Sequence, residues 1–85
     1  MTEIVWKEKA IDFLRKLDKK DSERIVKKID SIKENTWRYI ETLVAVNFNK
    51  IRVGDWRLFV DYSQKEDKLV IHVIEHRKKV YKKLK

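Results

Sequence analysis

The sequence predicts one small α+β domain over residues 1–85, in which a helix pair packs on one face of a mostly antiparallel sheet. Three observations support this fold. Apolar residues follow a helical period early in the chain and a period of two later, and the one glycine lies between two β-prone runs. The expected order of elements is β-α-α-β-β-β, followed by a short C-terminal helical or extended tail.

The first half of the chain is expected to contain one strand and both helices. Residues 3–6 are short and β-prone, which predicts the opening strand. Asp21 or Ser22 is expected to cap the second helix, because a short side-chain oxygen accepts hydrogen bonds from the amides of the first turn. That helix should end near residues 35–38, where the periodicity stops. The apolar stripes of the two helices are Ala10, Ile11, Phe13, Leu14, Leu17, Ile25, Val26, Ile29 and Ile32.

The second half is predicted to be β-structure. Residues 39–46 fit either an extended helix or a new strand, and we expect a loop that enters a strand near Ala45. Gly54-Asp55 predicts a two-residue type II′ turn. A second turn at residues 64–67 should lead to the apolar run 69–74, typical of a central strand. Alternation in the strand between these turns separates Trp56, Leu58, Val60 and Tyr62 from Arg57, Phe59 and Asp61.

The charge and composition limit the possible functions. The chain carries a net charge of +8, and residues 76–85 contain no acidic residue. Such a surplus favours a polyanion such as RNA, DNA or an acidic protein segment, although a lysine-rich solvated surface fits the composition equally well. There is no cysteine, which excludes disulfides, and no cofactor is indicated. No stretch is apolar enough to span a membrane, so a soluble cytoplasmic protein is expected.

Two short motifs resemble those of the RelE/ParE toxin superfamily, and more narrowly its RelE-like branch. Lys50-Ile-Arg-Val-Gly-Asp-Trp-Arg57 is similar to K-(L/I)-R-x-G-(D/N)-(Y/W)-R, and His76-Arg-Lys-Lys-Val-Tyr81 is similar to H-R-x-x-(V/I)-Y. The order of elements extends the resemblance over the whole chain. The resemblance implies a type II toxin that is held by a cognate antitoxin. Such a toxin inhibits translation as an endoribonuclease, or mRNA interferase, that cleaves mRNA in the ribosomal A site.

The resemblance also implies roles for individual residues. Metal-independent cleavage needs a deprotonated 2′-hydroxyl, stabilisation of the charge on the phosphorane and a proton for the leaving 5′-oxygen. Arg57 and Arg77 match the family arginines that stabilise the transition state. Tyr81 matches the tyrosine that orients the substrate and assists proton transfer, and Lys50 fits a phosphate anchor or a base. The residues expected to bind RNA are Arg52, His76, Lys78, Lys79 and Lys82, although Arg52 fits a surface salt bridge equally well and these lysines also fit a solvated surface.

Phe48 departs from the RelE pattern, which has a second lysine two residues before Lys50. His76 can partly compensate, because histidine carries protons near neutral pH. His72 and His76 lie about 13 Å apart if they share a strand, too far to hold one metal ion, so no metal site is expected.

Each residue also has a purely structural interpretation. Arg57 fits a strand arginine that pairs with Asp61 or with a cross-strand acid. Arg77 and Tyr81 fit the solvated face and packed tip of a C-terminal helix. The remaining aromatic candidates are expected in the core or at an interface; these are Trp6, Trp37 and Trp56.

Three functions stay open at this point. The first is the ribosome-dependent nuclease, and the second is a ParE-like inhibitor of DNA gyrase. The third is a basic binding module whose active site has decayed, which Phe48 supports. The presence of Arg57, Arg77 and Tyr81 favours the nuclease, because a pure binding module has no reason to gather these groups on one sheet face.

Overall fold

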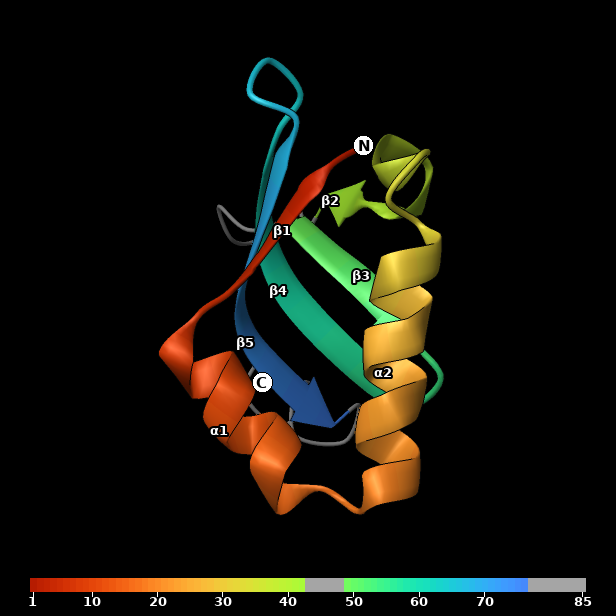
Figure 1. Ribbon diagram of the computed structural model, residues 1–85, viewed down its shortest axis with the longest axis vertical. Helices are drawn as coiled ribbons and strands as arrows, with labels where there is room; N and C mark the ends of the chain where they lie inside the picture. Colours follow the sequence, from red (N-terminus) through yellow and green to blue (C-terminus); the bar gives the residue numbers. More distant parts are fainter. Residues whose placement is uncertain (43–48, 77–85) are drawn as a thin grey trace.

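The computed structural model describes residues 1–42 and 49–76, and within these residues the chain forms two α-helices, one 3-10 helix and a five-stranded sheet (Figure 1). The strand order is β1-β5-β4-β3-β2, in which β1 runs parallel to β5 and the other neighbours are antiparallel. The predicted fold class is confirmed, and the two-residue β2 adds a strand at Glu41–Thr42, where a loop was preferred over a new strand. In chain order, the elements are β1 Glu3–Trp6, α1 Glu8–Lys16, α2 Lys19–Ser31, the 3-10 helix η1 Thr36–Tyr39, β2 Glu41–Thr42, β3 Asn49–Val53, β4 Trp56–Ser63 and β5 Lys68–His76.

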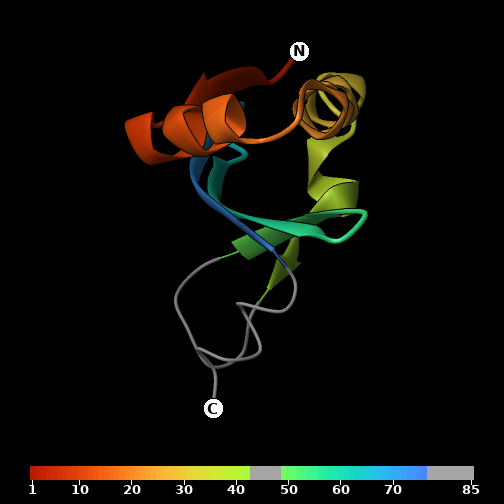
Figure 2. The ribbon, with the colours of Figure 1, turned by 90° about the horizontal axis from the view of Figure 1, so that it is seen from below.

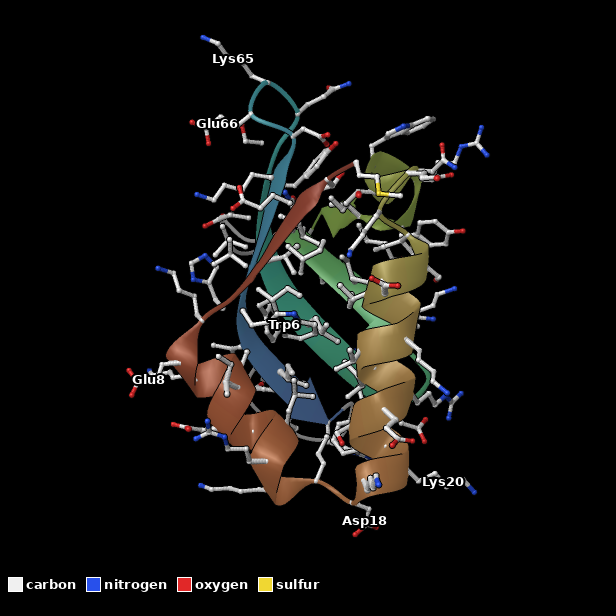
Figure 3. The ribbon with its side chains drawn as sticks, viewed as in Figure 1. Trp6, Glu8, Asp18, Lys20, Lys65 and Glu66 are labelled. Atoms are coloured by element: carbon white, nitrogen blue, oxygen red, sulfur yellow. The ribbon has the colours of Figure 1, made fainter. Side chains whose placement is uncertain are left out.

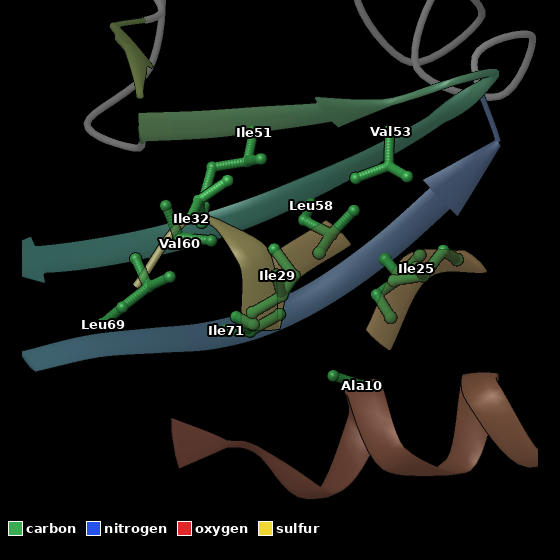
Figure 4. Close-up of a cluster of buried hydrophobic side chains, with 11 residues drawn as sticks. Ala10, Ile25, Ile29, Ile32, Ile51, Val53, Leu58, Val60, Leu69 and Ile71 are labelled. Atoms are coloured by element: carbon green, nitrogen blue, oxygen red, sulfur yellow. The ribbon is translucent and has the colours of Figure 1, made fainter. Parts of the chain in front are cut away.

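The hydrophobic core lies between the sheet and the two helices, which cover the same face (Figure 2). Helix α1 packs mainly on β5 and α2 mainly on β3. Figure 4 shows Ala10 of α1 and Ile29 of α2 directed toward the buried side chains of the sheet. Two members of the predicted apolar stripes were wrongly assigned to the core, since Ile11 is 37% exposed and Val26 is 43% exposed. Both helices therefore bury a narrower face than their sequences suggest.

The second helix begins earlier than the sequence predicted. Helix α1 ends at Lys16, and two extended residues, Leu17 and Asp18, connect it to α2. Asp18 occupies the N-cap position, although its side chain makes no capping hydrogen bond. The prediction of Asp21 or Ser22 as the cap was wrong, because both residues lie inside the helix, where the Ser22 hydroxyl donates to the Lys19 carbonyl at 3.1 Å.

The C-terminal end of α2 also differs from the expectation. The helix ends at Ser31 rather than near residues 35–38, and the chain then forms η1. The strand expected near Ala45 falls partly on residues 43–48, which lie outside the described part of the chain.

The hairpin between β3 and β4 agrees with the prediction. Gly54 has φ of 58°, and among the described non-glycine residues only Asp67 has a positive φ, so the turn has the type II′ pattern. A Cβ atom at position 54 would also lie 3.0 Å from Nη2 of Arg24 on α2. Alternation along β4 is confirmed, since Leu58 and Val60 are buried in the core.

A bulge in β5 changes which residues face the core. Phe59 lies opposite Val73 and Val60 lies opposite Ile71, so His72 is an extra residue in β5. Because of this insertion, Ile74 lies on the same core face as Ile71 although the two are three positions apart. The His72 side chain has a polar partner on β4, because its Nε2 lies 2.7 Å from Oδ2 of Asp61.

The tryptophans do not share one environment. Trp6 points between the sheet and the helices, whereas Glu8, Asp18 and Lys20 point away from the core (Figure 3). Trp56 also packs against the core. Trp37 of η1 is 57% exposed. In the described residues, no helix is long and apolar enough to cross a membrane.

A buried polar cluster fixes η1 against the N-terminal segment and the β4–β5 turn. The Thr36 hydroxyl lies 2.9 Å from Oγ1 of Thr2 and 3.0 Å from the Ile32 carbonyl oxygen. The Thr2 hydroxyl donates to Oδ1 of Asp67 at 2.7 Å. Since Thr2 and Thr36 are both buried, these hydrogen bonds are shielded from water.

We expect Thr36→Val to lower the free energy of unfolding by about 1–2 kcal/mol, because it leaves buried acceptors without their donor while keeping the side-chain volume. For a domain of this size, the melting temperature should fall by about 5–10 °C. Ser31→Ala is the control, because the Ser31 hydroxyl makes a similar bond to the Lys28 carbonyl at an exposed position. A Thr36→Val melting temperature equal to that of Ser31→Ala would contradict the assigned role of the cluster.

Candidate functional site

The candidate site lies on the far face of the sheet, which is the face turned away from α1 and α2. Because side chains alternate along a strand, Lys50 and Arg52 of β3 lie on this face, opposite in direction to the buried Ile51 and Val53. In β4, the same alternation places Arg57 on the far face, since Leu58 points into the core. The β3–β4 hairpin thus brings together the three cations that the sequence selected from its first motif.

The register arranges these cations in two neighbouring rows. In one row, Arg57 lies between Arg52 of β3 and Glu75 of β5. In the other row, Phe59 lies beside Lys50, and Glu41 of β2 lies on the other side of Lys50. Directly opposite residues on one face have their Cβ atoms about 5 Å apart. The two rows therefore form a compact group of cations with one aromatic side chain and a carboxylate at either edge.

The pair Arg52 and Arg57 is the most informative feature of the site. Arg57 is 5% exposed, whereas Arg52 is exposed. Like charges placed directly opposite each other destabilise a sheet, and a guanidinium is costly to bury. The cross-strand pair therefore gathers positive charge on the far face of the sheet. Arginine suits a phosphate in particular, because its planar fork donates to two oxygens and stays charged.

The acidic neighbours bear on the structural interpretation of Arg57. Glu75 lies directly across from Arg57, as the cross-strand alternative predicted. Asp61 was the other expected partner, and its Oδ2 is engaged by His72 at 2.7 Å. Glu75 is therefore the acidic residue that the register places directly opposite Arg57.

His76 lies on the opposite side of the sheet from the cations. Its ring packs edge-on against Trp56, with centroids 5.0 Å apart, and Trp56 packs edge-on against Phe13 of α1 at 5.7 Å. The structure thus places His76 toward the helices and does not bring it together with Lys50 and Arg57. The bulge at His72 causes this placement, because it shifts the alternation of every later residue in β5.

The second motif lies almost wholly outside the described residues. This holds for Arg77, Lys78, Lys79, Tyr81 and Lys82, and also for Phe48. The far-face cluster of Lys50, Arg52 and Arg57 is accordingly the part of the candidate site that has a described geometry.

Two features of the site were not recognised in the sequence. Glu41 and Glu75 flank the cations, but both come from other strands, and local patterns do not reveal such pairings. Arg24 lies against the hairpin turn, where the absence of a Cβ on Gly54 gives it room. The lone glycine was the available signal for that close approach. In the described residues, no three His, Cys, Asp or Glu side chains gather in a way that could hold a metal ion.

The fold and this arrangement can be compared with known proteins. No protein-family model matches the sequence, and no curated protein matches it. Among solved structures, the toxin–antitoxin complex RelBE2 from Mycobacterium tuberculosis matches with a TM-score of 0.78 and 19% identity, over 89% of this chain and 98% of that one. The archaeal RelE–RelB complex from Pyrococcus horikoshii OT3 matches with a TM-score of 0.75 and 16% identity, over 89% and 94% of the two chains.

The isolated E. coli RelE toxin matches with a TM-score of 0.73 and 18% identity, over 99% of this chain and 95% of that one. At sequence identities of 16% to 19%, these matches show that the chains share a fold. The chain is a small α+β domain with the fold of RelE toxins, as the two motifs predicted.

Proposed function

We propose that this protein is the toxin of a type II toxin–antitoxin pair and that it cleaves mRNA in the ribosomal A site without a metal ion. The observation that carries the proposal is the cross-strand pair of Arg52 and Arg57 beside Lys50 on the far face of the sheet. The RelE fold supports it, because the matching solved structures are RelE toxins and their antitoxin complexes.

The proposed reaction is an attack of the substrate's own 2′-oxygen on the adjacent phosphorus. A new bond between the 2′-oxygen and phosphorus forms while the bond from phosphorus to the 5′-oxygen breaks. The products are a 2′,3′-cyclic phosphate and a 5′-hydroxyl end. One proton leaves the 2′-hydroxyl and one is added to the 5′-oxygen, so the reaction needs a proton acceptor and a proton donor.

The roles of the residues follow from the charge that develops during this reaction. Negative charge increases on the phosphorane oxygens, so Arg57 and Arg77 stabilise it, and their effect is greatest where water is excluded. Arg57 is buried, which suits this role. Lys50 anchors the phosphate or accepts the proton, and Tyr81 orients the nucleotide. Arg52, with Lys78, Lys79 and Lys82, contacts neighbouring phosphates.

A cognate antitoxin is the proposed protein partner. An acidic or amphipathic segment would order on the toxin surface and cover apolar groups that the monomer leaves exposed. The structure offers such a surface in a hollow between the two helices, lined by Leu14, Ser22, Glu23, Val26 and Lys27. The proposed compartment is the cytoplasm, where the ribosome is found.

The test is induction of the wild-type protein in bacterial cells, followed by primer-extension mapping of a translated mRNA. We expect growth arrest and new 5′-hydroxyl ends at fixed positions within codons. The same mRNA with its start codon removed is the control, because it does not enter the ribosome and should stay intact. Growth arrest with intact mRNA and altered plasmid supercoiling would instead favour inhibition of gyrase.

A further inference from the structure

A second surface combines exposed aromatic rings with cations, and it lies outside the far-face site. It consists of Trp37, Arg38 and Tyr39 of η1 together with Lys28 of α2, and we call it the η1 platform. Trp37 is 57% exposed and Tyr39 is 42% exposed. Large aromatic side chains usually bury most of their surface, so two exposed rings on one short helix need an explanation.

Each ring of the platform has a cation over it. The Arg38 guanidinium lies 5.2 Å from the centroid of the Trp37 ring, and the Lys28 ammonium lies 4.8 Å from the centroid of the Tyr39 ring. Such contacts contribute little stability at exposed positions. They do hold a positive charge beside an aromatic face, which is the combination that binds a base and its phosphate together.

The platform is held in place from beneath. Thr36, the first residue of η1, is buried, and its hydroxyl lies 2.9 Å from Oγ1 of Thr2 and 3.0 Å from the Ile32 carbonyl oxygen. These hydrogen bonds therefore fix the start of the short helix that carries the exposed rings. A rigid ring loses little conformational entropy when a ligand binds. Asp30 of α2 is paired with Lys33, which follows the helix, at 2.7 Å, so its charge is offset.

The position of the platform relates it to the candidate active site. Helix η1 connects the end of α2 to the edge strand β2 (Figure 1). Glu41, two residues after Tyr39, is the cross-strand neighbour of Lys50. The platform therefore lies two residues from the sheet edge beside Lys50, and its Tyr39 ring contacts Lys28 on the helix side.

We propose that the η1 platform is a stacking subsite for single-stranded RNA, in which Trp37 and Tyr39 bind bases and Arg38 and Lys28 bind the adjacent phosphates. RNA is chosen over a protein partner because each ring is paired with a cation and the chain carries a net charge of +8. The choice of RNA rests on the proposed function, whereas the existence of the exposed platform does not.

The test is binding of a fluorescently labelled 2′-O-methyl oligouridylate to the purified protein, measured by anisotropy over a range of salt concentrations. The 2′-O-methyl group blocks the attacking hydroxyl, so binding is measured separately from cleavage. We expect Trp37→Ala to weaken binding about tenfold, because base–aromatic stacking contributes about 1–3 kcal/mol per base. The slope of the logarithm of the affinity against the logarithm of salt should not change, because Trp37 carries no charge.

Three further variants complete the experiment. Trp37→Phe retains an aromatic face and should bind within about threefold of wild type. Arg38→Gln should reduce the salt slope by about 0.7, the value for one phosphate contact to a single strand. Ile11→Ala is the control, because it removes an exposed apolar side chain from α1 and should leave binding unchanged.

Two results would overturn the proposal. One is a Trp37→Ala affinity equal to that of wild type and of Ile11→Ala, which includes the case that wild type does not bind the oligonucleotide. The other is a Trp37→Ala variant that binds RNA as tightly as wild type but no longer self-associates in sedimentation. This result would make the platform a protein interface. Neither result bears on cleavage, which depends on Arg57, so a failure of this proposal can be told apart from a failure of the proposed function.

Discussion

Replacing Arg57 by methionine is expected to abolish growth arrest and to slow cleavage of ribosome-bound mRNA by about 10²–10³-fold, the usual cost of removing one group that stabilises transition-state charge. Methionine fills much of the space of the buried side chain and removes only the guanidinium. Cleavage is measured with purified ribosomes programmed with a defined mRNA. Circular dichroism and thermal unfolding establish that the variant is folded.

Arg15→Met is the matched control for this prediction. Its side chain is 76% exposed on α1, on the other side of the sheet from the candidate site. It removes the same charge and should leave cleavage unchanged. Arg52→Gln should have an intermediate effect, because Arg52 is exposed and its charge is screened by water. A folded Arg57→Met protein that cuts mRNA at the wild-type rate would rule out the assigned role.

Ile29→Ala should lower the free energy of unfolding by about 3 kcal/mol, within the range measured for large-to-small substitutions in protein cores. Ile29 is 1% exposed and packs between α2 and the sheet (Figure 4). For a chain of this length the total stability is about 4–13 kcal/mol, so the loss is a large fraction of it. The measurement is urea unfolding followed by circular dichroism.

Ile11→Ala provides the comparison, because it makes the same chemical change on a helix at a position that is 37% exposed. Its expected effect is below about 1 kcal/mol, since alanine also favours the helix. Equal losses for the two variants would show that the core does not lie where the structure places it.

The β3–β4 hairpin shows what the sequence can predict well. Gly54 occupies the position that needs a positive φ, and this fixes the turn and therefore the register of the two strands. Once the register is fixed, alternation determines that Lys50, Arg52 and Arg57 share a face. Local chemistry was sufficient for this part of the site, because all of it lies within eight consecutive residues.

The face on which His76 lies could not be predicted, because nothing in an almost continuous apolar run marks an extra residue. The sequence from Leu69 to Ile74 is compatible both with a regular strand and with a strand that contains a bulge. The pairings of Glu41 and Glu75 could not be predicted either, because they join strands that are distant in sequence.

The start of α2 was predicted wrongly for a different reason. Lys19 and Lys20 interrupt the apolar pattern, but lysine is a good helix former and both fit the solvated first turn of α2.

The parallel pairing of β1 with β5 has a consequence for how the protein folds. The contact between Thr2 and Asp67 spans 65 positions, so it closes one of the longest loops available to the described chain. Long-range pairing slows folding, because the chain loses loop entropy before the contact stabilises it. Among the described strands, β5 lies between β1 and β4 and is the last to be synthesised. The sheet is therefore completed only after almost all of the described chain has been synthesised, and any activity that depends on it begins late.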